Sequence, residues 1–169
     1  MISTPAEIFV ETDAFRVSRE GQCLACELHA AVAVCVCDDT QGSGGLLHLR
    51  YVATQGDEPL DLTDNTLSSD LLLMDRFCKE LRATGARKQS WRVSILAHMP
   101  ETPGMEKPAA TVIDLVKAYF ADARLPAECR EFRSSEGVLV RMDTREGRIW
   151  VSGLASPGSP PQRSRAGAG

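Results

Sequence analysis

The side chains of this sequence that are best suited to covalent and acid–base chemistry are thiols and imidazoles. The chain has six cysteines and three histidines. Cys26 precedes an apolar run in a possible turn, Cys35 lies within that run, and His48 lies in the next one. A thiolate activated by an imidazole attacks carbonyl carbon, whereas a buried thiol without such a partner is a small core side chain. Buried, unreactive thiols are the simpler interpretation of Cys26 and Cys35.

A metal site is the second chemistry that the cysteines suggest. Cys23 and Cys26 form a C-x-x-C pair, and Cys35 and Cys37 follow. Structural zinc sites present their ligand pairs from turns, but Cys35 and Cys37 lie inside an apolar, strand-like run. The pair Asp38-Asp39 is typical of a turn rather than of a cation site. We therefore expect no metal, no cofactor and free thiols in a reducing compartment, with a zinc-stabilised adaptor as the alternative.

Two predicted strands position His48. Residues 31–37 alternate between two apolar faces, which predicts a strand that is covered on both sides. Residues 38–44 are dense in turn-forming residues, and a second strand is predicted over residues 46–52. In that strand His48 and Arg50 share one face, so we expect His48 to point away from the most apolar side.

The other two histidines have no partner that the sequence identifies. We expect His29 and His98 at the surface. A histidine on a strand, taken alone, is more often a structural or surface residue than a catalyst, and this applies to His48 as well.

The rest of the chain predicts an α+β fold with a mixed β core, in sandwich-like sheets, covered by two main helices. The helix over 65–84 has an apolar stripe at three- and four-residue steps: Leu67, Leu71, Met74, Cys78 and Leu81. That helix is expected to have Asp64 as its N-cap and Gly85 as its stop. A second helix is expected from Pro108 to before Pro126, with five buried residues: Val112, Leu115, Val116, Tyr119 and Phe120. The remaining expected elements are one or two strands over 7–17, a strand over 91–96, a loop over 100–108, and hairpin strands over 138–142 and 148–151.

Length and composition limit the classes of protein to consider. The 169 residues predict one domain over residues 1–153, and the Ser-, Pro- and Gly-rich residues 154–169 predict a disordered tail. A net charge of -4 and a pI near 5.4 argue against nucleic acid as a partner. No apolar run reaches the length of a membrane span, and the first residues lack the pattern of a secretory signal. We therefore expect a cytoplasmic protein without membrane insertion.

The most motif-like stretch is His29-Ala30-Ala31 at the start of the first strand, followed by Gly44-Gly45 and His48 in the second. It resembles the CheD-type chemoreceptor glutamine deamidases, in which a Gly-Ser-Cys turn opens a strand and a glycine-led strand carries a histidine seventeen residues after the cysteine. Ala31 and His48 are also seventeen residues apart. The later elements follow a similar order, so the resemblance covers roughly residues 25–152 and implies a CheD-like fold.

The resemblance implies a site that has lost its reactive groups. In the family, a cysteine thiolate attacks the side-chain amide of a receptor glutamine, a histidine activates the thiol, and a threonine helps to hold the histidine. Residue by residue, His48 matches the histidine, Ala31 occupies the position of the nucleophile and Ala25 that of the threonine. The family's Gly-Ser before the cysteine is His29-Ala30 here, and its Gly-Gly after the third strand is Ala97-His98.

Two hypotheses about function follow. The first is a catalytically degenerate chemotaxis protein, a pseudoenzyme that binds chemoreceptors (methyl-accepting chemotaxis proteins) or a CheC-type phosphatase. The second is an active chemoreceptor glutamine deamidase, a hydrolase in which Cys26 replaces the missing nucleophile beside His48. Cys35 is a poorer substitute, since it lies about 13 Å from Ala31 along the same strand.

Overall fold

The computed structural model describes residues 7–19, 21–38, 40–51 and 65–154. The helices and strands are β1 (Glu7–Phe9), β2 (Ala14–Ser18), β3 (Cys23–Leu28), β4 (Ala31–Asp38), β5 (Ser43–Arg50), α1 (Asn65–Ala83), the 3-10 helix η1 (Lys88–Ser90), β6 (Trp91–Pro100), α2 (Glu106–Asp122), β7 (Ala127–Ser134), β8 (Val138–Asp143) and β9 (Arg148–Gly153). The expected N-cap at Asp64, the Asp39 half of the acidic pair and the expected tail lie outside the described residues, apart from Leu154.

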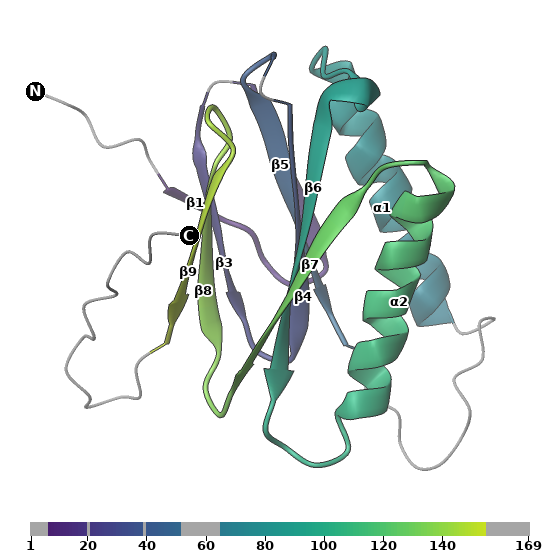
Figure 1. The fold of residues 1–169 in the computed structure, drawn as a ribbon, viewed down its shortest axis with the longest axis vertical. Helices are drawn as coiled ribbons and strands as arrows, with labels where there is room; N and C mark the ends of the chain where they lie inside the picture. The colour runs from purple at the N-terminus through teal and green to yellow at the C-terminus, as the bar shows by residue number, and fades with distance from the viewer. Residues whose placement is uncertain (1–6, 20, 39, 52–64, 155–169) are drawn as a thin grey trace, which may run out of the picture.

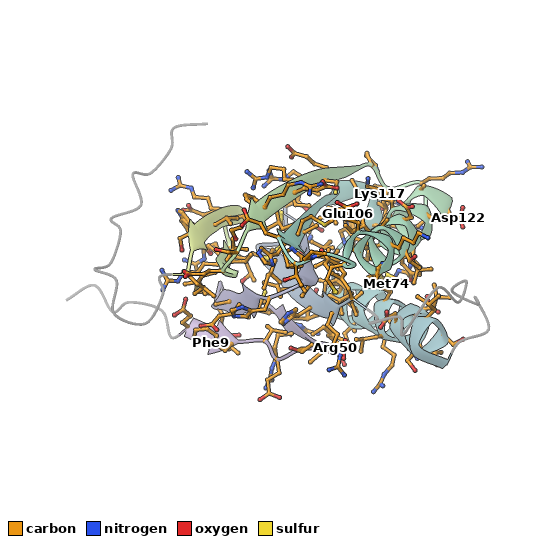
Figure 2. All side chains as sticks on the ribbon, turned by 90° about the horizontal axis from the view of Figure 1, so that it is seen from below. Phe9, Arg50, Met74, Glu106, Lys117 and Asp122 are labelled. Carbon is orange, nitrogen blue, oxygen red and sulfur yellow. The ribbon has the colours of Figure 1, made fainter. Side chains whose placement is uncertain are left out.

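The strands form two mixed sheets, and two helices cover one of them, which confirms the α+β prediction (Figure 1). The first sheet has the strand order β1-β3-β8-β9, and the second has the order β2-β5-β4-β6-β7. The first sheet packs on one face of the second, and α1 and α2 pack on the other face. Figure 2 shows Met74 of α1 directed toward the sheets, with Phe9 on the side of the molecule away from the helices.

Strand β4 is the centre of the molecule because both of its faces are apolar. All eight of its residues are buried, as the alternation of its sequence predicts. One face, with Val32, Val34 and Val36, belongs to the core under the helices. The other face, with Ala31, Ala33 and Cys35, belongs to the core between the two sheets. Its neighbours in the sheet are β5 and β6, both antiparallel to it.

The helices match the predicted boundaries closely, but the buried stripe of α1 is displaced. Leu67, Met74, Cys78 and Leu81 are buried as expected, whereas Leu71 is 39% exposed and Asp70 is buried in its place. In α2, Leu115 and Tyr119 are only partly buried. Neither described helix is long and apolar enough to cross a membrane.

Two strands were not predicted, and a third is longer than expected. Cys26 lies inside β3 and not in a turn, because Cys23–Leu28 pairs with both β1 and β8. Strand β7 is an edge strand with mostly exposed or half-buried side chains, so it lacks an apolar pattern. Strand β6 extends to Pro100, and this extension places Ala97 and His98 inside the sheet.

Candidate functional site

Ala31 begins β4 on the face that looks toward the first sheet, and His48 lies diagonally across from it. Ala31 pairs with Arg50 of β5, and Ala33 pairs with His48. Paired residues of an antiparallel ladder share a face, so these four side chains belong to one surface of the sheet. The diagonal neighbours in such a ladder are about 7 to 8 Å apart, within reach of a long or aromatic side chain. The Ala31 side chain is 1% exposed.

The His48 imidazole is buried and held by a backbone carbonyl. Its exposed fraction is 4%, and Nδ1 lies 3.2 Å from the carbonyl oxygen of Val10. Because a carbonyl only accepts, this contact requires the proton on Nδ1 and leaves Nε2 as the free base. Burial lowers the pKa of His48, although the Val10 contact and Asp13 oppose that shift. His48 is therefore a neutral imidazole at pH 7, in the tautomer that a general base needs.

Ala25, which the resemblance predicted at the position of a threonine, lies on β3 in the other sheet. It pairs with Phe9 on one side and with Arg141 on the other. Its side chain is on the face of β3 opposite to that of Leu24 and Cys26, which contact the core between the sheets. The connection from Ala25 to His48 runs through backbone: Val10 N–H donates to the Ala25 carbonyl at 2.7 Å, and the Val10 carbonyl accepts from His48.

His98 is a buried member of this cluster, which corrects the expectation that it lies at the surface. It is 2% exposed, and it follows Ala97, the partner of Val32 on β4. The Ala30 N–H donates to His98 Nδ1 at 3.0 Å, directly before Ala31 in the chain. Burial lowers the pKa of His98 as well. The sequence contains a signal for this placement, since Leu96 and His98 share one face of an apolar strand.

His29 is the exposed histidine of the three, as expected, and it forms the turn between β3 and β4 together with Ala30. Its side chain is 62% exposed and its Nε2 lies 3.6 Å from a carboxylate oxygen of Glu27. Gly137 packs against this turn so closely that a Cβ there would lie 2.5 Å from the Leu28 carbonyl oxygen. The turn that precedes Ala31 is thus enclosed on the side of β8.

The cysteines of the inter-sheet core are poor nucleophiles. Burial raises the pKa of Cys26 to about 12, and the charge of Glu27 adds to that shift. Burial also raises the pKa of Cys35 well above its ordinary value, with a smaller effect from Cys26. Both thiols are therefore protonated at neutral pH, and a thiol reacts far more slowly than a thiolate.

The structure does not support the zinc alternative. Cys23 and Cys26 lie on opposite faces of β3, because they are three residues apart on a strand. Within the described residues, no three side chains from His, Cys, Asp and Glu are arranged to hold a metal ion. The six cysteines all lie in the described part of the chain and form no disulfide there.

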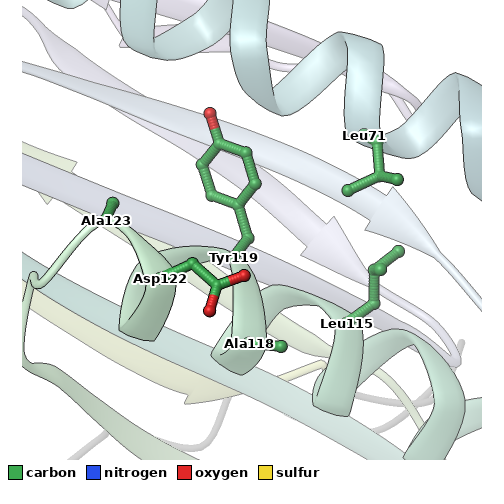
Figure 3. Close-up of a pocket in the computed structure, with 6 residues that line it drawn as sticks. All are labelled: Leu71, Leu115, Ala118, Tyr119, Asp122 and Ala123. Carbon is green, nitrogen blue, oxygen red and sulfur yellow. The ribbon is translucent and has the colours of Figure 1, made fainter.

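A separate groove lies between the two helices, on the other side of the β4 sheet. It encloses about 380 Å³ and is lined by Leu71, Leu115, Ala118, Tyr119, Asp122 and Ala123 (Figure 3). The Tyr119 hydroxyl donates to an Asp75 carboxylate oxygen at 2.6 Å and so connects α2 to α1. The lining of the groove contains no thiol and no imidazole, so it contains none of the side chains that the sequence suggested for catalysis.

The arrangement around Ala31 supplies a base without a nucleophile. His48 lies diagonally across from Ala31, Arg50 is the partner of Ala31 in β5, and His98 accepts the N–H of the preceding Ala30; none of these side chains is a thiol or a hydroxyl. No protein-family model matches the chain, and comparison with curated proteins also gave no match.

Proposed function

We propose that the protein is a catalytically degenerate, CheD-like chemotaxis protein that acts by binding chemoreceptors or a CheC-type phosphatase in the cytoplasm. One observation carries the proposal. Ala31 and His48 lie on one face of adjacent antiparallel strands, in diagonal positions of the ladder, and Ala31 has a methyl group at the position that the resemblance assigns to the thiol.

The missing chemistry can be stated step by step. In the family reaction, a thiolate sulfur forms a bond to the glutamine side-chain carbonyl carbon, the C–N bond breaks, and the histidine supplies the proton with which ammonia leaves. Water then hydrolyses the thioester to glutamate and regenerates the thiol. A methyl group at position 31 forms no such bond, whereas His48 retains the tautomer for the proton steps.

Binding is tested first, with the unaltered full-length chain. Purified protein is titrated by calorimetry with a soluble cytoplasmic fragment of a chemoreceptor and, separately, with a CheC-type phosphatase. The proposal expects a saturable complex with at least one of them. An Arg50→Glu variant is expected to weaken this complex, because Arg50 is 71% exposed beside Ala31; Arg148→Glu, which is 68% exposed on β9 in the other sheet, is the matched control. Absence of binding to both proteins contradicts the proposal.

Restored chemistry is tested second. The variant Ala31→Cys places a thiol in the position diagonal to His48, and Ala31→Ser is the control of similar size. Deamidation is measured as the mass increase of receptor peptides that contain glutamine. We expect a measurable increase with Ala31→Cys, none with Ala31→Ser, and none when His48→Ala is added to Ala31→Cys.

The alternative is an active deamidase in which Cys26 attacks and His48 acts as base. It is favoured by one observation, namely that both side chains face the layer between the sheets. The raised pKa of Cys26 disfavours it, since the thiol is protonated at neutral pH. The two proposals differ in one measurement: the alternative expects the unaltered protein to deamidate receptor peptides and Cys26→Ala to abolish that activity.

A further inference from the structure

The turn in front of Ala31 contains a residue in a costly backbone conformation. Ala30 has φ of 51°, in the left-handed region that residues other than glycine adopt at an energetic cost. Such a conformation persists only where the surroundings hold it. Both backbone polar groups of Ala30 are engaged: its N–H donates to His98 Nδ1 at 3.0 Å, and its carbonyl accepts the N–H of Tyr51 at 3.2 Å.

His98 connects this turn to the end of β7. Its Nε2 lies 3.0 Å from the Ser134 hydroxyl oxygen and 3.2 Å from the Ser134 carbonyl oxygen. The Ser134 hydroxyl in turn donates to the Glu136 carbonyl. One imidazole therefore joins three segments that are far apart in sequence: the β3–β4 turn, β6, and the end of β7.

These contacts define the protonation state of His98. A backbone N–H only donates, so Nδ1 must present its lone pair to Ala30. The hydrogen of the Ser134 hydroxyl is used on Glu136, so Nε2 must carry the proton that Ser134 accepts. His98 is thus neutral and protonated on Nε2, the opposite tautomer to that of His48.

We propose that His98 is a positioning residue: as a neutral imidazole protonated on Nε2, it fixes the turn that sets where Ala31 lies relative to His48. The family pattern has glycine at position 98, so the hydrogen bonds from this side chain to the turn are a feature of this chain and not of the pattern. The inference rests on the contacts of the turn and not on the chemotaxis role, and the two are tested by different measurements.

A fall in pH should break the hydrogen bond between the Ala30 N–H and His98 Nδ1. A second proton on His98 would lie on Nδ1, where it meets the Ala30 N–H donor head-on and breaks the hydrogen bond. The titratable and charged groups on the surrounding elements are His29 on the turn, His48 on β5, Glu136 after β7, and Arg130 of β7, which contacts the ring of Phe132, the partner of His98. Glu131 and Arg133 of β7 lie on the opposite face from Phe132. None of these places a carboxylate against Nδ1, which accepts from Ala30.

The experiment measures hydrogen exchange of the Ala30 amide by NMR in the full chain, corrected for the intrinsic effect of pH. At pH 8 we expect protection in the unaltered protein and a loss of about tenfold or more in His98→Ala, because the donor loses its acceptor. His98→Asn is the conservative variant, since its Oδ1 occupies the place of Nδ1. The exposed His29→Asn is the matched control and should leave the protection unchanged.

The pH dependence separates a positioning role from a general loss of packing. Protection at Ala30 should fall between pH 8 and pH 5 in the unaltered protein and stay constant in His98→Asn, because an amide does not titrate. Nitrogen-15 shifts of the imidazole should show a neutral ring protonated on Nε2 at pH 8. An Nδ1-protonated or charged ring at pH 8, or Ala30 protection that is the same with and without His98, would overturn the proposal. If His98→Ala fails to fold, the proposal is tested by comparing the pH dependence of Ala30 protection in the unaltered protein and in His98→Asn.

Discussion

At the scale of single residues, His48 makes stability depend on pH. Its pKa in the folded protein is lowered by burial, so folding favours the neutral ring. The stabilisation is complete above the unfolded pKa of about 6.5 and is lost as the pH falls from there toward the lower folded value. We therefore expect the contribution of His48 to the free energy of unfolding in urea to decrease from pH 7.5 to pH 5.

A matched pair of variants assigns this loss to His48. Asn at position 48 retains an N–H donor for the Val10 carbonyl but does not titrate, so His48→Asn should flatten part of the pH dependence. His29→Asn removes an exposed ring without changing the hydrogen bond of His48 to Val10, and it should retain most of the pH dependence that His48→Asn removes. Equal profiles for His48→Asn and the unaltered protein would show that the His48 ring titrates alike in the folded and unfolded chain.

Asp70 makes folding stability depend on pH in the opposite direction to His48. It is 5% exposed, its Oδ2 has no hydrogen-bond partner, and burial raises its pKa to about 6. A raised carboxyl pKa destabilises the folded state progressively as the pH rises from the unfolded value of about 4 through the folded value. We expect Asp70→Asn to raise the free energy of unfolding at pH 7.5 by about 1 to 3 kcal/mol. Asp114→Asn, on the exposed face of α2, is the control and should change it little; a destabilised Asp70→Asn at pH 7.5 would contradict the assignment.

At the scale of elements, the contact of β5 with α1 depends on the absence of a side chain at Gly45. A Cβ there would lie 2.6 Å from Phe77 of α1 and 2.8 Å from the Arg16 carbonyl oxygen of β2. Gly45→Ala should therefore lower the free energy of unfolding by about 1 to 3 kcal/mol, the usual cost of overpacking. Gly153→Ala, at the end of β9 with no atom near the added Cβ, should be close to neutral. Chemical denaturation of the two variants measures the difference.

The elements that the sequence predicts well are those with a clear apolar period. Strand β4 and helix α1 have such patterns, and both agree with the prediction to within one residue at each described end. Strand β7 was missed because its position at the edge of a sheet exposes charged side chains such as Glu128 and Arg130, and an edge strand needs no apolar face. Strand β3 was missed because Cys26 was expected in a turn before the apolar run, whereas pairing with β1 and β8 determines the conformation of this segment.

The candidate site was also predictable only in part, because local strand alternation can be read from the sequence and tertiary pairing cannot. Strand alternation predicts that His48 and Arg50 share a face, and the cross-strand register then places that face beside Ala31. The position of His98 depends on the extension of β6 past Leu96, which tertiary pairing with β4 and β7 produces. The hydrogen bond from Ala30 to His98 spans 68 residues, and a local pattern contains no information about a contact of that range.

At the scale of the whole molecule, two cores share one strand. Val34 of β4 contributes to the core under the helices, and the adjacent Ala33 and Cys35 contribute to the core between the sheets. Loss of either core exposes one face of β4 and removes the support of the other. Because β4 also pairs with β5 over its full length and with β6 from Val32 to Asp38, we infer that the two layers unfold as one cooperative unit.

The two tryptophans of the chain can test this cooperativity, since one lies in each layer. Trp91 is buried in the core under the helices, and Trp150 lies half-exposed on β9 of the other sheet. In the single-tryptophan variants Trp150→Phe and Trp91→Phe, each remaining fluorophore reports on its own layer. We expect the urea transition of each variant to coincide with its own circular dichroism transition, because β4 couples the layers. If the Trp150 signal changes at lower urea than the circular dichroism of the same variant, the first sheet unfolds separately and β4 does not couple the two cores.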